Sequence, residues 1–328
     1  MRTIDWRELY ASNRAVIERA GRPRAREETA TIVAGRTRRA LVHTPAGLVP
    51  GTAVPLVCML HGCTQDAASF AAATRMDEAA DHHGFIVVYP QQERGNNAQG
   101  CWNWFQPRHQ ARGAGEPASI AAVLRELIGT TSPWTVDPRR VFVVGLSAGG
   151  AMAAILAAGY PDLVAAVAVH SGLAYRSATS VAAAFKAMAH GVRDPGACGR
   201  AAHAAMGDLA RPVPSIVVHG SDDRTVDPVN GDQVLEQSMT ANRLAAPDTC
   251  DFDIGRPADT SRGRVDGGHR YALSRWTDRR GALMHAQLKV DGLGHAWSGG
   301  LPGGSFTDPR GPDATEAIWS FFAQSGRR

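Results

Sequence analysis

The stretch Val141-Phe-Val-Val-Gly-Leu-Ser-Ala-Gly-Gly150 decides the fold of this chain. Its first four residues are apolar and favour β-structure, so they predict a short buried strand. The next five residues, Gly145 to Gly149, match the pattern G-x-S-x-G, and the small residues of 151–158 predict a helix. A serine on a tight turn between a strand and a helix presents its hydroxyl group for chemistry. We therefore interpret Ser147 as a nucleophile.

The glycines of this turn have a physical reason. Gly145 and Gly149 lack a Cβ atom, so the strand and the helix can approach closely around Ser147. The N-terminus of the helix adds backbone N–H groups and the positive end of its dipole beside the reacting oxygen. In α/β-hydrolases this arrangement is the nucleophile elbow, and an acid and then a histidine follow it in the chain. The alternative is a glycine-rich turn without a chemical role, since the chain contains 35 Gly.

Length and composition are those of an ordinary globular protein. The chain has 328 residues, of which 44% are hydrophobic and 20% charged, enough for one large α/β domain or two smaller ones. The net charge of +4 comes from scattered Arg residues, so we expect no nucleic-acid partner. No apolar run is long enough to span a bilayer, and the charges within Met1–Glu8 do not fit a signal peptide. The cysteine spacings differ from a paired C-x-x-C zinc site, and we expect neither a metal nor an organic cofactor.

Strands and helices alternate along the chain. We expect a polar N-terminal extension over residues 1–28, with helical periodicity over 6–20, and one domain over 29–328. Apolar runs predict strands at 29–34, 39–43, 54–60, 84–90, 164–170, 215–220, 270–276 and 282–290. Helices are predicted at 70–83, 119–128, 229–244 and 315–322, a turn at 136–140 and a helical cap at 178–214. The pattern predicts the α/β-hydrolase fold, with a mostly parallel central sheet and helices on both faces.

A second loop leaves a central strand through His61-Gly-Cys-Thr-Gln-Asp66. In α/β-hydrolases a loop at this place supplies one of the two backbone N–H groups that stabilise the oxyanion. We assign these two groups to Cys63 and Ala148. His61 is interpreted as a structural histidine that holds the loop, with contact to the substrate as the alternative.

The acid is expected on the loop after the strand 215–220. Three aspartates compete there: Asp222, Asp223 and Asp227. The pattern His-Gly-x-x-Asp-x-x-Val selects Asp223, and Asp222 is its main rival. Asp227 precedes a proline, which is typical of a turn or a helix cap.

The histidine is expected on the glycine-rich loop 291–300, which follows the last strand. His295 is the histidine of this loop, and we assign it as the base ahead of His269 and His285, which lie in or beside strands. Trp297, two residues after His295, is expected to form a wall of the substrate cleft, with simple packing as the alternative.

A long loop, 91–115, contains Cys101-Trp-Asn-Trp-Phe105. Long loops inside compact domains are usually functional. We therefore expect Trp102 or Trp104 to line the substrate cleft, although the two tryptophans could equally form a satellite core.

Taken together, these motifs resemble the esterases of the poly(3-hydroxybutyrate) depolymerase family, within the α/β-hydrolases. The resemblance runs from about residue 29 to the C-terminus, and several loops agree in their order. The matching stretches are Leu60-His-Gly-Cys-Thr-Gln65, Cys101-Trp-Asn-Trp-Phe105, Gly145-Leu-Ser-Ala-Gly-Gly-Ala-Met152, His170-Ser-Gly172, His219-Gly220 with Asp223, Gly294-His-Ala-Trp-Ser-Gly-Gly300 and Gly304-Ser-Phe-Thr-Asp-Pro-Arg-Gly-Pro-Asp313.

The resemblance implies a triad of Ser147, Asp223 and His295, with Cys63 as an oxyanion donor. It also implies a disulfide between Cys63 and Cys101. The implied activity is hydrolysis of carboxylic esters, above all poly(3-hydroxybutyrate) or its oligomers, through an acyl-enzyme. Many relatives are secreted and some carry a separate substrate-adsorbing domain, and we expect neither a secretion signal nor such a domain in this chain.

Two alternatives to this activity remain. Feruloyl and acetylxylan esterases share similar folds and motifs, so aromatic or acetyl esters are alternative substrates. A non-enzymatic binding module on the same fold is less favoured, because the serine, the acid and the histidine are all present.

Overall fold

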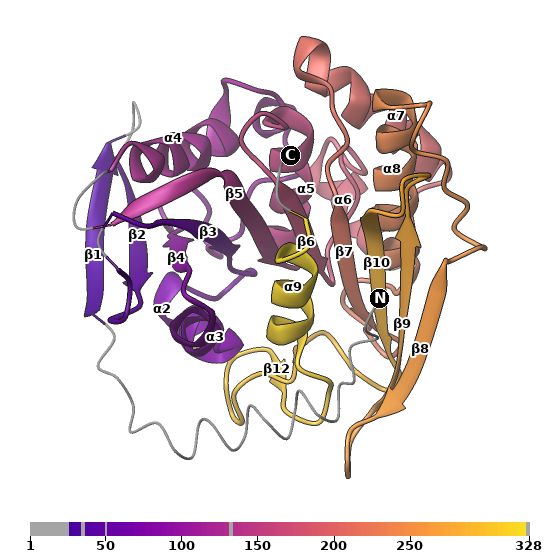
Figure 1. The fold of residues 1–328 in the computed structure, drawn as a ribbon. Coiled ribbons are helices and arrows are strands. Elements are labelled where there is room, and N and C mark those ends of the chain that lie inside the picture. The colour runs from indigo at the N-terminus through magenta and orange to yellow at the C-terminus, as the bar shows by residue number, and fades with distance from the viewer. Residues whose placement is uncertain (1–25, 34–36, 50, 131–133, 326–328) are drawn as a thin grey trace.

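The computed structural model describes residues 26–33, 37–49, 51–130 and 134–325 (Figure 1). Its strands are β1 Arg26–Val33, β2 Thr37–Thr44, β3 Ala53–Leu60, β4 Ile86–Pro90, β5 Thr135–Leu146, β6 Ala166–His170, β7 Ser215–Gly220, β8 Asp259–Arg264, β9 Arg270–Thr277, β10 Leu283–Val290, β11 Trp297–Ser298 and β12 Thr307–Asp308. Its α-helices are α2 Ala67–Thr74, α3 Met76–His83, α4 Gly115–Gly129, α5 Ala148–Gly159, α6 Val181–His190, α7 Pro195–Met206, α8 Val229–Ala245 and α9 Ala314–Phe322. Two short 3₁₀ helices lie at Pro107–His109 and Gly207–Leu209.

Within the described residues, a ten-stranded sheet has the order β1-β2-β4-β3-β5-β6-β7-β10-β9-β8. The strands from β4 to β10 in this order are parallel to their neighbours. The strands β1 and β2 at one edge, and β9 and β8 at the other, pair antiparallel. The sheet is therefore mostly parallel, as the alternating strands and helices predict.

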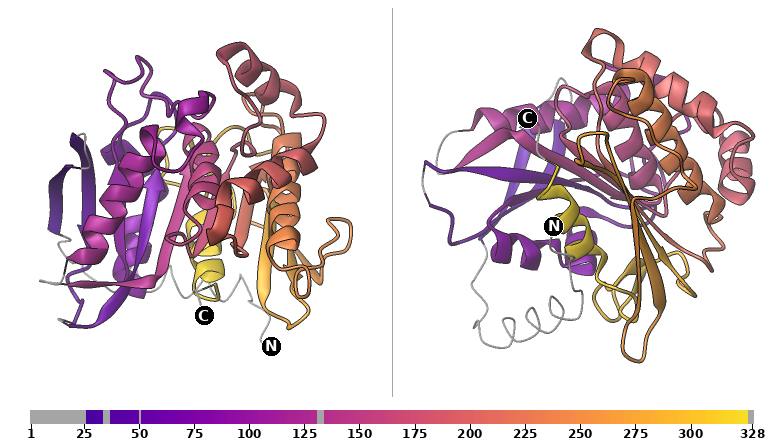
Figure 2. Two further views of the ribbon diagram at one scale, coloured as in Figure 1. Left: turned by 90° about the horizontal axis from the view of Figure 1, so that it is seen from above. Right: turned by 45° about the vertical axis from the view of Figure 1, so that its right-hand side comes forward.

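Helices cover both faces of the sheet (Figure 2). The residues of the central strand β3 alternate between two cores, one on each face. In β3, Leu56 and Cys58 face a core that also contains buried residues of α4, α5, α7 and α8. Their neighbours Val57 and Met59 face a second core, which contains buried residues of α2, α3 and α9. This two-residue alternation between two apolar layers explains why the strand sequences are almost continuously apolar.

The parallel strands place the loops of interest at one edge of the sheet. The strands β3, β5, β7 and β10 run parallel, so their carboxyl ends lie at the same edge. The loops that contain Cys63, Ser147, Asp223 and His295 follow these four ends. This edge is where open α/β sheets bind their ligands.

Two predicted elements differ from the structure. The helix predicted over 70–83 is wrong as a single helix, because α2 and α3 are separated at Arg75. Arg75 has a φ of 58°, and its backbone N–H donates to Ala71 O, which ends α2. The turn predicted over 136–140 is part of β5, where the pairing with β3 shifts register and the extra residues form a bulge. The strand β8 and the short pair β11 and β12 have no counterpart among the predicted elements.

The helical periodicity over 6–20 lies outside the described residues. The first described strand, β1, begins at Arg26 and so extends across the predicted boundary at residue 29. The assignment of 29–328 to one domain stays a prediction. Across the described ranges, the helices are all too short or too polar to cross a membrane.

Candidate active site

Ser147 lies on the turn between β5 and α5. Its φ of 58° and ψ of −120° belong to a region that residues with a side chain rarely adopt. Its backbone N–H donates to His170 O at 2.9 Å, which ties the turn to the end of the neighbouring strand β6. The sheet therefore holds the serine in a strained conformation, as expected for a nucleophile elbow.

The glycines beside Ser147 allow this turn to exist. A Cβ atom on Gly145 would lie 2.1 Å from the carbonyl carbon and oxygen of Gly149. A Cβ atom on Gly149 would lie 2.0 Å from Leu60 O, at the end of β3. Both distances are far below van der Waals contact with backbone atoms, so the G-x-S-x-G pattern is a packing requirement at this turn.

Asp223 and His295 form a close pair. The Nδ1 atom of His295 lies 2.7 Å from Asp223 Oδ2, and Asp223 Oδ1 accepts from the backbone N–H groups of Thr225 and Val226 at 2.9 Å each. Burial raises the pKa of Asp223, but hydrogen bonds from His219 and His295 outweigh burial and hold this pKa well below its usual range. The carboxylate is therefore ionised at neutral pH and fixes the imidazole through Nδ1, which leaves Nε2 for chemistry.

The competing aspartates have other surroundings. Asp222 is exposed, and its side chain accepts from Ser221 Oγ at 3.1 Å. Asp227 accepts from the backbone N–H of Val229 at 2.9 Å, at the start of α8, which is the cap-like role expected of it. Asp223 is thus the aspartate of this loop that pairs with His295.

The competing histidines are engaged away from the elbow. His285 is fully buried in β10, where its two ring nitrogens contact Ser215 and Asn242. The Nε2 atom of His269 lies 2.9 Å from Asp308 Oδ2. These contacts give both histidines structural roles.

Ser147 and His295 line the same cavity, which has a volume of about 450 Å³. Among the described residues that line it, His295 is the only one of the types Asp, Glu, Lys, Arg and His. The described lining consists of Gly62, Cys63, Thr64, Gln65, Asn97, Gln99, Cys101, Trp104, Phe105, Leu146, Ser147, Val181, Ala184, Phe185, Met188, Thr225, His295 and Phe306. The cavity therefore suits an uncharged, largely apolar molecule.

The two expected oxyanion donors come from two different loops. Ala148 follows Ser147 as the first residue of α5, and Cys63 lines the cavity from the loop after β3. In the described part of the chain, the N–H groups of Cys63 and Ala148 have no hydrogen-bond acceptor, whereas the N–H groups of Gly62 and Thr64 donate to Gln65 Oε1 and Gln99 O. Free N–H groups beside a nucleophile are what an oxyanion hole requires.

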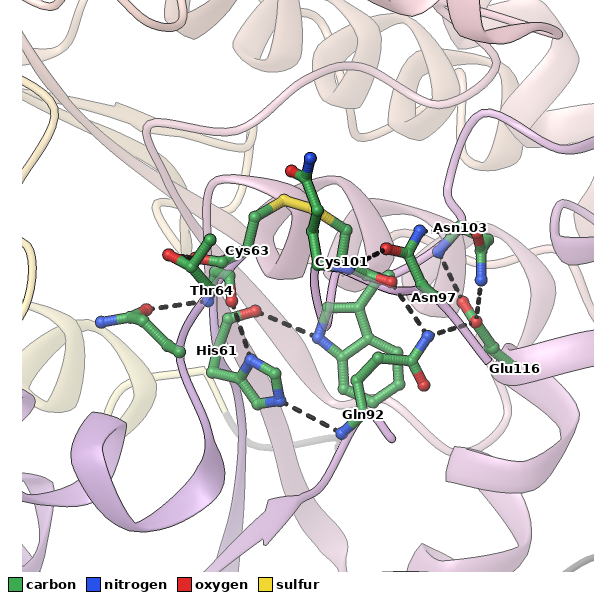
Figure 3. The surroundings of a disulfide bond; sticks show 12 residues. His61, Cys63, Thr64, Gln92, Asn97, Cys101, Asn103 and Glu116 are labelled. Carbon is green, nitrogen blue, oxygen red and sulfur yellow. Dashed lines mark hydrogen bonds between the residues drawn. A yellow bond between two sulfur atoms is a disulfide. The ribbon is translucent and has the colours of Figure 1, made fainter. Parts of the chain in front are cut away.

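A disulfide joins Cys63 to Cys101, as the family resemblance implies, and Figure 3 shows it beside a network of hydrogen-bonded residues. The loop of Cys63 is also held by the bond from Thr64 N to Gln99 O at 2.8 Å, and by the bond from Trp102 Nε1 to His61 O at 3.0 Å. These contacts come from the long loop 91–115. That loop therefore supports the loop after β3 as well as lining the cavity.

Glu116, at the start of α4, holds this long loop through hydrogen bonds, and it was not identified from the sequence. Its buried carboxylate accepts from Gln92 Nε2 at 2.5 Å, from Asn103 Nδ2 at 2.6 Å and from Asn103 N at 2.7 Å (Figure 3). A buried carboxylate with several donors fixes the groups around it. A lone glutamate near the start of a helix gives no sequence pattern from which this role could be read.

Three residues considered for substrate contact, Trp102 and Trp297 as expectations and His61 as an alternative, do not line the cavity. Trp102, Trp297 and His61 are all buried, and none is among the described residues that line the cavity. Trp297 donates from Nε1 to Thr315 Oγ1 at 3.1 Å and stacks on the ring of His170, so it is a packing residue. Trp104, the other tryptophan of the long loop, does line the cavity.

His61 has the structural role that was weighed against substrate contact. Its Nε2 accepts from Gln92 N at 3.1 Å, so the ring hydrogen is on Nδ1, which lies 2.8 Å from Gly62 O. Burial lowers the pKa of His61, in keeping with a neutral imidazole. This histidine joins the loop after β3 to the loop after β4.

The apolar residues at the mouth of the cavity were not predicted from the sequence. Val181, Phe185 and Met188 come from α6, within the predicted helical cap, and Phe306 comes from the C-terminal tail. Phe185 is 67% exposed and Phe306 is 43% exposed. The spacing of four and three residues along α6 could have indicated one apolar face, but it does not show that this face borders a cavity.

The described residues contain no group of three or more His, Cys, Asp or Glu side chains arranged to hold a metal ion. The histidine that lines the cavity, His295, is the one that pairs with Asp223.

The chain is similar in sequence to known esterases and depolymerases. A family model described as "Esterase PHB depolymerase" matches residues 40–255. Over 218 residues, which cover 66% of this chain and 51% of the relative, the chain is 41% identical to "Poly(3-hydroxyalkanoate) depolymerase C" of Paucimonas lemoignei. It is 35% identical to "Feruloyl esterase B" of Neurospora crassa over 39% of this chain and 42% of the relative. It is 31% identical to "Probable acetylxylan esterase A" of Neosartorya fischeri over 60% of this chain and 53% of the relative.

The chain spans about half the length of these curated relatives. Among solved structures, the fold is similar to that of an acetyl xylan esterase from Aspergillus awamori, with a TM-score of 0.70 and 21% identity over 92% of this chain and 99% of that one. The predicted α/β-hydrolase fold is confirmed. Because the family model covers more than half of its residues, the chain belongs to the esterase PHB depolymerase family.

Proposed function

We propose that the protein hydrolyses carboxylic esters with Ser147 as the nucleophile, His295 as the general base and Asp223 as the acid of a triad. One observation carries the proposal. Ser147 lines the same cavity as His295, and the Nδ1 atom of His295 is held 2.7 Å from Asp223 Oδ2. A strained serine beside an imidazole that a buried carboxylate orients is the arrangement that acyl transfer needs.

The reaction follows from these positions. Ser147 Oγ attacks the ester carbonyl carbon while His295 Nε2 takes the hydroxyl proton, and Asp223 stabilises the imidazolium that forms. The N–H groups of Cys63 and Ala148 stabilise the negative oxygen of the tetrahedral intermediate. His295 then returns the proton to the leaving alcohol, which gives an acyl-enzyme. Water, deprotonated by His295, attacks the acyl carbonyl. The bond to Ser147 Oγ then breaks, His295 returns the proton to this oxygen, and the acid is released.

The substrate that we propose is poly(3-hydroxybutyrate) or its oligomers. The cavity lining offers aromatic and aliphatic side chains and uncharged amides, which suit a chain of short aliphatic ester units. The exposed Val181, Phe185 and Phe306 continue this apolar surface to the mouth of the cavity. The 41% identity to a relative named as a poly(3-hydroxyalkanoate) depolymerase supports the same substrate class.

A second candidate substrate is a feruloyl ester. Trp104 and Phe105 line the cavity with their rings at 87° to each other, and such a pair can pack against an aromatic acyl group. A relative named as a feruloyl esterase supports this candidate, at 35% identity over a shorter stretch.

The deciding experiment measures three substrates with one enzyme preparation: amorphous poly(3-hydroxybutyrate), methyl ferulate and acetylated xylan. The active-site concentration is calibrated by titration with a fluorophosphonate. Release of 3-hydroxybutyrate oligomers at a rate above that of the other two supports the polyester, whereas preferential release of ferulate or acetate assigns the site to plant cell-wall esters.

Ser147→Ala tests the chemistry itself. It is expected to lose several orders of magnitude in kcat on every substrate, because the acyl-enzyme cannot form. A folded Ser147→Ala variant that retains most of its esterase activity would refute the proposed nucleophile. Failure of the wild-type enzyme to react with the fluorophosphonate would favour a binding module instead.

A further inference from the structure

His219 is a buried histidine that the proposed reaction does not use. It is the next-to-last residue of β7, and its side chain is 3% exposed. Its Nε2 atom lies 3.0 Å from Val226 O and 3.4 Å from Asp223 Oδ2. A backbone carbonyl can only accept, so the ring hydrogen is on Nε2, between this carbonyl and the carboxylate oxygen.

This hydrogen completes the surroundings of the Asp223 carboxylate. The carboxylate Oδ1 accepts from two backbone N–H groups, those of Thr225 and Val226. The carboxylate Oδ2 faces His295 Nδ1 and His219 Nε2. An ionised carboxylate has about four acceptor positions, and these four donors match them. The backbone donors belong to the carboxylate's own loop, whereas His219 belongs to the central sheet.

The position of the His219 imidazole is fixed from its other side by α8. A Cβ atom on Gly231 would lie 2.8 Å from His219 Nδ1 and 3.0 Å from His219 Cβ, so the helix backbone rests on the ring. The buried Nδ1 atom has no hydrogen-bond partner among the described residues. A buried polar atom without a partner carries a free-energy cost, which a purely structural site would avoid with an apolar side chain.

We infer that His219 is a positioning residue for the proposed triad, as the second imidazole N–H directed at Asp223 Oδ2. It fixes the direction of the oxygen that holds His295, and so keeps His295 Nε2 aimed at the serine. The N–H group of His219 also helps to keep the buried carboxylate of Asp223 ionised, in line with the low pKa of this carboxyl group. The inference rests on the proposed function, because it assigns His219 a part in the same ester hydrolysis.

The test compares His219→Phe, His219→Gln and Gly231→Ala on p-nitrophenyl butyrate. His219→Phe keeps an aromatic ring of similar shape and removes the donor. Its kcat is expected to fall roughly 10- to 100-fold, the rate equivalent of one hydrogen bond to a charged group, with KM within about twofold of wild type. His219→Gln can place an amide N–H close to the position of Nε2, and most of the lost kcat is expected to return.

Gly231→Ala leaves the imidazole intact and displaces it, because the added methyl group needs the space of Nδ1. Its kcat is expected to fall in the same direction as that of His219→Phe. The control for the loss of a buried histidine is His285→Gln, on β10, whose ring contacts Ser215 and Asn242. At mildly alkaline pH this control is expected to keep the wild-type kcat.

The outcomes separate this inference from the proposed function. If wild type hydrolyses the ester, Ser147→Ala does not, and folded His219→Phe keeps the wild-type kcat, the inference alone is overturned. Equal losses in His219→Gln and His219→Phe would also overturn it, since the donor would not be the property that matters. If His219→Phe does not fold, a folded Gly231→Ala with wild-type kcat overturns the inference, and one with reduced kcat supports it. Activity that survives Ser147→Ala refutes the proposed function instead.

Discussion

Removal of the Cys63–Cys101 disulfide is expected to separate stability from catalysis. The bond closes a loop of 38 residues in sequence. The chain-entropy relation for a loop of this length gives a loss of about 4 kcal/mol in the free energy of unfolding when the bond is absent. The disulfide is attached directly to the residue whose N–H is proposed to bind the oxyanion, so a catalytic effect is also expected.

The structure limits the size of that catalytic effect. Loss of one complete oxyanion donor lowers kcat roughly 10²- to 10³-fold. In this protein the hydrogen bonds from Thr64 N to Gln99 O and from Trp102 Nε1 to His61 O hold the same two loops on either side of Cys63. We therefore expect kcat to fall by no more than about tenfold, which corresponds to about 1.4 kcal/mol of transition-state stabilisation.

The assay uses the double variant Cys63→Ala/Cys101→Ala, so that no single thiol is left unpaired. Urea unfolding followed by tryptophan fluorescence gives the stability, and turnover of p-nitrophenyl butyrate gives kcat. Dithiothreitol should lower the stability of wild type towards that of the double variant and leave the double variant unchanged. A stability loss below about 1 kcal/mol would refute the loop argument. A kcat loss as large as that of a missing donor would show that the two hydrogen bonds do not hold the loop.

Three further predictions concern packing, pH and the cavity mouth. Gly149→Ala is expected to cost about 3 kcal/mol or more and to abolish activity, because its Cβ would lie 2.0 Å from Leu60 O. Gly129→Ala, where a Cβ meets nothing within 4 Å, should be neutral or stabilising by about 0.5–1 kcal/mol, and thermal unfolding of both variants checks the contrast. Burial lowers the pKa of His285 to about 3, below its value in the unfolded chain, so its contribution to stability is complete above pH 6.5 and is lost as the pH falls towards 3. Between neutral pH and pH 5, wild type should lose about 2 kcal/mol of its free energy of unfolding through His285, and urea unfolding should show a smaller loss in His285→Gln. An equal loss in wild type and His285→Gln would contradict the lowered pKa of His285. Phe185→Ser, at a position 67% exposed, should change stability by less than about 0.5 kcal/mol but lower the ratio of p-nitrophenyl octanoate to acetate turnover, and an unchanged ratio would remove Phe185 from the substrate path.

Local patterns in the sequence were enough to predict the turn of Ser147 and the loop of Asp223, which follow the carboxyl ends of parallel strands. The strand, turn and helix around Ser147 follow from apolar β-formers, two obligatory glycines and a run of small residues. Asp223 is preferred to Asp222 because it fits the pattern His-Gly-x-x-Asp-x-x-Val, and to Asp227 because that aspartate precedes a proline. Strand ends and turn glycines are local properties of the chain, and they can be read without knowledge of the packing.

The single helix predicted over 70–83 and the turn predicted over 136–140 failed for a different reason. The break at Arg75 requires a left-handed residue at a position where glycine or asparagine would be usual, so the sequence gives no warning of it. The residues of 136–140 have turn-like character, but pairing with β3 draws them into β5 as a bulge. In both cases tertiary contacts override local propensity.

The sequence alone determined the alternation of most strands and helices, the place of Ser147, Asp223 and His295 after strand ends, and the likeness to one esterase family. Only the tertiary structure decided which side chains meet. In that structure Trp102 and Trp297 are buried away from the cavity lining, Phe185 and Phe306 are exposed and line the cavity, and His219 faces the carboxylate of Asp223. The physical reason is that the periodicity of a helix or strand depends on residues close together in the sequence. Burial and hydrogen-bond partners depend on residues far apart in the chain, which the sheet brings together.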